Sequence, residues 1–209
     1  MKTAWLAGAS GLVGGELLER LLADASFDRV IAVGRRALPR SSPKLESVEV
    51  DFADPKSFEG LAPPAVAFSC LGSTIKKAGS KQAFEAVDLD AVVTFAKAAL
   101  DHGAKTFVHV SSLGADPRSR TFYSSVKGRA EAAVAALGFD TVVALRPSIL
   151  DGERGESRPL ERIGLGIARV LGPFLGKYRP TPVSAVARTM IAATRMRGVH
   201  VIDAADVHA

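Results

Sequence analysis

Short apolar runs alternate along this chain with longer segments whose apolar residues recur at helical spacing. Apolar runs of this kind are typical of strands buried on both faces of a sheet, and they cover 3–7, 30–33, 48–50, 65–69, 107–110, 141–145 and 199–202. Helical spacing predicts helices over 12–22, 55–60, 81–102, 123–137, 160–171 and 184–195. Strands that alternate with helices predict a parallel sheet. We therefore expect an α/β fold of the Rossmann type, a doubly wound parallel sheet with helices on both faces.

The length of 209 residues and the apolar fraction of 47% indicate one globular domain over 1–209. Within it, the Gly- and Pro-rich stretch 150–183 is expected to form a small substrate-side region. The start of the chain, a lysine and a short apolar run, resembles a signal peptide, but the glycines of 8–15 and the helix after them favour a strand, turn and helix. No run reaches the roughly 18 apolar residues of a membrane span, so we expect no membrane partner.

Three glycines, Gly8, Gly11 and Gly14, lie between the first strand and the first helix. In such a turn one glycine permits the tight bend, another lets the backbone approach a pyrophosphate, and the last lets helix and strand pack closely. The free N–H groups at the start of the helix then face the anion, and Ser10 adds a hydroxyl donor. The turn therefore predicts a dinucleotide-binding site.

The end of the second strand indicates which dinucleotide. Dehydrogenases that use NAD usually place a carboxylate about 20 residues after the turn, whereas this chain has Arg35 and Arg36 there. A guanidinium can bind a 2′-phosphate through two hydrogen bonds, so we expect NADP(H). The alternative is a pair of solvated loop arginines. Asp51, after the third strand, is either an acceptor for the adenine amino group or a cap of the local turn.

A serine, a tyrosine and a lysine form a candidate catalytic set. Ser111 ends the fifth strand, and Tyr123 and Lys127 share one face of the next helix. An isolated tyrosine releases its proton only near pH 10, and a nearby ammonium favours the phenolate. Ser111, or Ser112 as the alternative, would polarise a carbonyl. Only one of the two should point into the site, because neighbouring strand residues face opposite sides. The other possible interpretation is two surface residues of a helix.

Charge and cysteine content add little. The net charge is +5, and the basic residues are scattered without a helix-turn-helix or zinc-finger pattern, so we expect no nucleic-acid partner. A merely basic surface explains the charge equally well. Cys70 is the single cysteine, which excludes an intrachain disulfide and favours a cytoplasmic location. The four histidines lack metal-ligand spacing, so no metal is expected.

Together, these residues resemble the atypical short-chain dehydrogenase/reductase superfamily, and more closely its Tat-interacting-protein oxidoreductase group with its bacterial relatives. The matching stretches cover most of the chain, and their combination is specific although no single motif is. They are 8–11, 34–36, 70–74, 111–116, 123 with 126–128, 146–147 and 156–159.

The resemblance implies an NADPH-binding Rossmann domain in which Tyr123 and Lys127 are the catalytic pair. Many members also have an asparagine in the long central helix, where this chain has Asp88 and Asp90. A carboxylate cannot supply the donors of an amide, which leaves a proton relay in doubt. By position, the cofactor contacts implied by the resemblance are Ser10, Gly11, Leu12 and Val13 at the pyrophosphate, Arg35 and Arg36 at the 2′-phosphate, Leu71 and Gly72 near the adenosine and ribose, and Leu150 and Arg158 at the nicotinamide.

The leading hypothesis is an NADPH-dependent oxidoreductase that transfers hydride to a small carbonyl substrate, with Tyr123 as acid and base. The alternative is a non-catalytic redox sensor or regulatory protein that binds NADPH. An intact serine, tyrosine and lysine set favours the enzyme, since a sensor need not retain it. The two long helices predicted over 81–102 and 123–137 could also form the interface of a homo-oligomer.

Overall fold

The computed structural model describes residues 1–151 and 180–207. Most of the expected substrate-side region, the helix predicted over 160–171 and Arg158 therefore lie outside the described residues.

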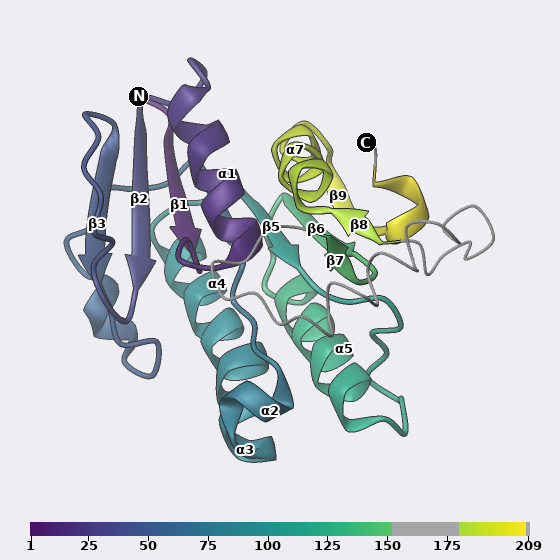
Figure 1. The fold of residues 1–209 in the computed structure, drawn as a ribbon. Coiled ribbons are helices and arrows are strands. Elements are labelled where there is room, and N and C mark those ends of the chain that lie inside the picture. The colour runs from purple at the N-terminus through teal and green to yellow at the C-terminus, as the bar shows by residue number, and fades with distance from the viewer. Residues whose placement is uncertain (152–179, 208–209) are drawn as a thin grey trace.

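A parallel sheet of seven strands forms the centre of the molecule (Figure 1). The strand order is β3-β2-β1-β4-β5-β6-β9, so the chain moves outward from β1 on one side and then returns to β4 on the other. This reversal between β1 and β4 is the place where ligands bind in open sheets of this type. The strands are β1 (Thr3–Ala7), β2 (Arg29–Gly34), β3 (Leu45–Glu49), β4 (Val66–Ser69), β5 (Thr106–Val110), β6 (Thr141–Arg146) and β9 (Gly198–Asp203).

Helices cover both faces of the sheet, as Figure 1 shows. One face carries α1 (Leu12–Ala23) and α7 (Val183–Ala193), and the other carries α4 (Ala91–Asp101) and α5 (Phe122–Ala135). The side chains of β1 explain the two layers: Leu6 joins the core under α1 and α7, and Trp5 joins the core under α4 and α5. The expected fold class is thus confirmed.

Shorter elements connect the layers. In chain order they are the 3₁₀ turn η1 (Pro55–Phe58), α2 (Ile75–Ala78), α3 (Lys81–Glu85), the π-helical turn η2 (Ala86–Asp90), the paired strands β7 (Leu150–Asp151) and β8 (Thr181–Pro182), and the 3₁₀ turn η5 (Ala204–Asp206).

The long helix predicted over 81–102 differs from the structure. It is divided into α3, the π-helical turn η2 and α4, which ends at Asp101. A π turn adds one residue to a helical turn and often occurs at functional sites. Here the turn buries the carboxylate side chain of Asp88 completely, whereas an amphipathic helix normally buries apolar residues. The third strand is also longer than predicted, because its half-buried residues begin at Leu45.

Candidate functional site

The glycine turn joins β1 to α1 at the reversal of the strand order. Gly8 has a φ of +82°, and a Cβ there would lie 2.6 Å from the carbonyl carbon and oxygen of Cys70. A Cβ on Gly14 would lie 2.1 Å from the Gly8 oxygen, and the Gly11 N–H donates to that oxygen at 2.9 Å. Close backbone contacts therefore require glycine at positions 8 and 14, whatever the turn binds.

The start of α1 is open to an anion. Gly11 is its N-cap, no side chain of the described residues caps the helix, and its first turn contains no acidic residue. The N–H groups and the helix dipole are thus not neutralised by a side chain. Ser10 is exposed beside them, Leu12 is half-buried, and the side chain of Val13 is buried in the core. Val13 can therefore contribute only its backbone N–H, whereas Ser10 can contribute its hydroxyl.

Arg35 and Arg36 follow β2 and are exposed, and neither forms an ion pair within the described residues. Nearby arginines differ: Arg29 pairs with Glu46, and Arg40 with Glu19. The two guanidinium groups are therefore available to an external anion.

The Asp51 Oδ1 accepts a hydrogen bond from the N–H of Ala53 at 2.9 Å. Asp51 therefore caps the local turn, which was one of the two roles expected for it. Leu71 and Leu150 are half-buried, and Gly72 is exposed.

Ser111 and Lys127 line one small cavity at the carboxyl end of β5. The Ser111 N–H donates to the Leu145 carbonyl at 2.6 Å, so the alternation of the strand continues and Ser111 faces the same side as His109. The cavity is lined by Asp88, Val92, His109, Val110, Ser111, Lys127 and Ala130. Ser111 is buried, and its Oγ has no hydrogen-bond partner within the described residues. Ser112 is half-buried and does not line the cavity.

Tyr123 lies in the first turn of α5, one turn before Lys127. It is half-buried, and its ring packs on Phe84 with centroids 5.4 Å apart. Tyr123 is absent from the residues that line the cavity. The structure thus brings Ser111 and Lys127 together and leaves Tyr123 at the adjacent aromatic contact.

Sequence reasoning missed the role of Asp88 in this site. Its side chain is fully buried, and Oδ1 lies 2.7 Å from the Nζ of Lys127, whose side chain is only 7% exposed. Oδ2 accepts from the N–H of Ser73 at 2.8 Å. A Cβ on Gly72 would lie 3.4 Å from both Asp88 Oδ1 and Lys127 Nζ. The one signal in the sequence was the departure from the expected asparagine.

His109 is the other residue that the sequence did not indicate. It is 2% exposed, and its Nε2 has no partner within the described residues. Burial, helped by the charge of Lys127, lowers the pKa of His109 to about 3, so the ring is neutral in the physiological range. Burial likewise raises the pKa of the Cys70 thiol to about 12, and that thiol is not a nucleophile at neutral pH.

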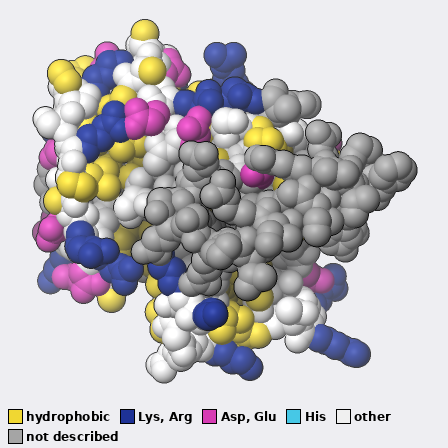
Figure 2. Space-filling view, in the orientation of Figure 1, with side chains coloured by type: hydrophobic (Ala, Val, Ile, Leu, Met, Phe, Trp, Pro, Cys, Tyr) yellow, Lys and Arg dark blue, Asp and Glu magenta, His cyan; other side chains and the backbone are white. Residues whose placement is uncertain are grey.

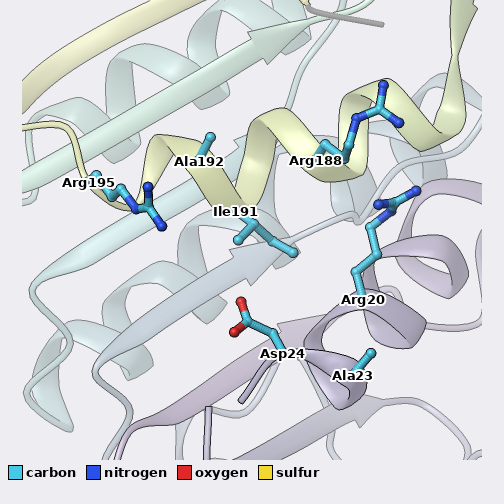
Figure 3. A pocket seen from close by; sticks show the side chains of 7 residues that line it. All are labelled: Arg20, Ala23, Asp24, Arg188, Ile191, Ala192 and Arg195. Carbon is cyan, nitrogen blue, oxygen red and sulfur yellow. The ribbon is translucent and has the colours of Figure 1, made fainter. Parts of the chain in front are cut away.

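A second hollow lies elsewhere, between α1 and α7 (Figure 3). It is at the carboxyl end of α1, whereas the glycine turn is at the other end of that helix, and it contains none of the predicted site residues. Its lining residues are Arg20, Ala23, Asp24, Arg188, Ile191, Ala192 and Arg195. Over the face drawn in Figure 2, basic side chains lie in several separate places with acidic ones among them.

Within residues 1–151 and 180–207, no helix is long and apolar enough to cross a bilayer, and no group of three metal-ligating side chains occurs. The same residues do fit a phosphorylated dinucleotide. The start of α1 suits a pyrophosphate, and the two guanidinium groups suit a further phosphate.

Comparisons with known proteins agree with an NAD(P)-binding site. A family model described as NAD(P)H-binding matches residues 8–197. The chain is 36% identical to the protein named "Protein fmp52, mitochondrial" of Emericella nidulans over 82% of this chain and 77% of that protein. It is also 36% identical to protein HTATIP2 of Rattus norvegicus over 91% of this chain and 80% of that protein.

Solved structures share the fold. MoeE5 in complex with UDP-glucose and NAD has a TM-score of 0.72 at 22% identity, covering 95% of this chain and 74% of that chain. A short-chain dehydrogenase from Burkholderia cenocepacia in complex with NADP has a TM-score of 0.69 at 19% identity, covering 97% of this chain and 90% of that chain.

The comparisons also correct one expectation. The similar proteins from Emericella nidulans, Aspergillus niger and Coccidioides immitis are named as mitochondrial, which contradicts the cytoplasmic location. That expectation rested on a single cysteine, and a low cysteine count does not distinguish one reducing compartment from another. On the family match, this chain belongs to the NAD(P)H-binding family, and protein HTATIP2 is among the relatives that it resembles.

Proposed function

We propose that this protein reduces a small carbonyl compound with NADPH. The observation that carries the proposal is the burial of Ser111 and Lys127 in one cavity at the carboxyl edge of the sheet. The turn and the start of α1 would hold the pyrophosphate, and Arg35 and Arg36 the 2′-phosphate. When bound, the nicotinamide supplies the hydride.

Side chains of this protein would stabilise the carbonyl oxygen of the substrate and supply the proton that it receives. The Ser111 hydroxyl, unpaired within the described residues, would donate a hydrogen bond to the substrate carbonyl oxygen and stabilise the charge that develops there. The Tyr123 hydroxyl would donate the proton. The Lys127 ammonium, one helical turn away, would favour the resulting phenolate.

The preference for NADPH over NADH is supported by the two exposed guanidinium groups after β2, which lack ion-pair partners within the described residues. A 2′-phosphate would receive charge-assisted hydrogen bonds from them, whereas a plain ribose would leave them in water.

The test is NADPH consumption with a panel of aldehydes and ketones, comparing the wild type with Tyr123→Phe. We expect turnover by the wild type and a decrease in kcat of about 100-fold or more in the variant, with little change in the Kd for NADPH. Equal turnover by both proteins would remove Tyr123 from the mechanism. Tight binding of NADPH without turnover of any compound would favour the sensor over the enzyme.

A further inference from the structure

Asp88 lies in an irregular helical turn, and each of its carboxylate oxygens has a close partner: Oδ2 is hydrogen-bonded, and Oδ1 is ion-paired without hydrogen-bond geometry. Oδ2 accepts the Ser73 N–H at 2.8 Å, and Oδ1 contacts Lys127 Nζ at 2.7 Å. The first contact comes from the loop after β4, and the second from α5. The π-helical turn η2 therefore presents a carboxylate whose position is set by two other elements of the fold.

Stability alone is a poor explanation for this pair. Both side chains are almost completely shielded from water, and removing two charges from water costs free energy that their attraction repays only in part. Apolar residues of similar size often replace such pairs without loss of stability. A buried pair at the edge of a cavity is therefore more readily explained by what it does for the cavity.

Three polar groups share the cavity with the Lys127 ammonium. Asp88 comes from η2, and His109 and Ser111 come from the end of β5. His109 is uncharged, because burial lowers its pKa to about 3. Asp88 is the one carboxylate among the described residues that line the cavity. It is thus the sole partner there that can balance the charge of Lys127.

We infer that Asp88 is a positioning residue, which keeps the Lys127 ammonium charged and fixed at the cavity that contains Ser111. This inference rests on the proposed function. It gives the aspartate a different task from the amide donors of the expected asparagine: the carboxylate contacts the lysine directly. Without Asp88, the buried ammonium would have no counter-charge among the described residues that line the cavity.

The first experiment measures the pair in the protein without cofactor. Urea unfolding is compared for the wild type, Asp88→Asn, Lys127→Met and the double variant, because a double-mutant cycle isolates the coupling of two residues. We expect the double variant to lose less stability than the sum of the two single losses. Additive losses would show that the two groups are not coupled and would overturn the inference.

The second experiment measures catalysis against a matched control. Asp90→Asn makes the same chemical change at an exposed position of the same π turn. We expect Asp88→Asn to lower kcat at least about tenfold and to move the alkaline limb of the pH–rate profile to lower pH. The KM should change little, and Asp90→Asn should match the wild type in all three. A purely structural role would not shift the pH profile.

The outcomes separate the two proposals. If the wild type turned over carbonyl compounds and Asp88→Asn kept its kcat and pH profile, the positioning role would be wrong while the proposed function stood. If the wild type turned over nothing, the proposed function would fail. A coupling found in the unfolding cycle would then be structural only, which would also overturn the positioning role.

Discussion

Two adjacent glycines at the start of α1 should respond in opposite ways to the same substitution. A Cβ on Gly14 would lie 2.1 Å from the Gly8 carbonyl oxygen, whereas a Cβ on Gly15 would lie 3.6 Å from the nearest atom outside its own helix, the Ala9 oxygen. The first contact is an overlap with backbone that cannot rotate away, and the second is ordinary van der Waals distance.

The magnitudes follow from these contacts. To accept alanine at position 14, the backbone of the turn must move by more than about 1 Å, and overpacking of this kind typically costs about 1–3 kcal/mol. Alanine at position 15 meets no overlap and has the higher helix propensity, which stabilises a helix interior by up to about 1 kcal/mol. Gly14→Ala should therefore destabilise the protein, and Gly15→Ala should stabilise it slightly.

Urea unfolding of the two variants beside the wild type measures the stability, and titration with NADPH measures the binding. Gly14→Ala should also weaken NADPH binding, because the displaced turn carries the N–H groups that would face the pyrophosphate. Equal shifts of the unfolding midpoint in the two variants would refute the reasoning from close packing. Full NADPH affinity in a destabilised Gly14→Ala would separate the turn from the cofactor.

Three further predictions concern the two ends of the site. Replacing both Arg35 and Arg36 by alanine should reduce the preference for NADPH over NADH by about 10- to 100-fold; an unchanged ratio of the two Kd values would remove them from cofactor recognition. Ser111→Ala should lower kcat by about 100-fold and Ser112→Ala should not, which steady-state kinetics at saturating substrate can decide. Acid should unfold the protein partly through His109: its contribution is complete above its ordinary pKa of 6.5 and is lost as the pH falls toward about 3. That loss approaches 1.4 kcal/mol per pH unit between these values, so His109→Leu should have a flatter dependence of unfolding free energy on pH.

The Tyr123→Phe comparison and the Asp88→Asn series share one useful property. Neither change alters the size of the side chain much, so a loss of activity with an intact fold points to the hydroxyl or to the charge. The ring of Tyr123 packs on Phe84, and a phenylalanine preserves that contact. Thermal unfolding of each variant provides the control for folding.

Much of the architecture could be predicted from local sequence. Buried parallel strands are continuous apolar runs, since both of their faces are covered. The run before Gly8 and the helix that begins at Leu12 locate the first βα unit. The spacing of Tyr123 and Lys127 places them on one side of a helix wherever that helix packs. These features depend on how side-chain direction repeats along a strand or a helix, and residues close together in the sequence determine that repeat.

Only the tertiary structure decided how the site is assembled. Whether Ser111 or Ser112 faces the cavity depends on the register of β5 against β6, and Asp88 meets Lys127 because a π turn packs against α5. The neutral state of His109 is a consequence of burial under other elements. Desolvation and ion pairing depend on what surrounds a group in space, and residues far apart in the chain supply those surroundings.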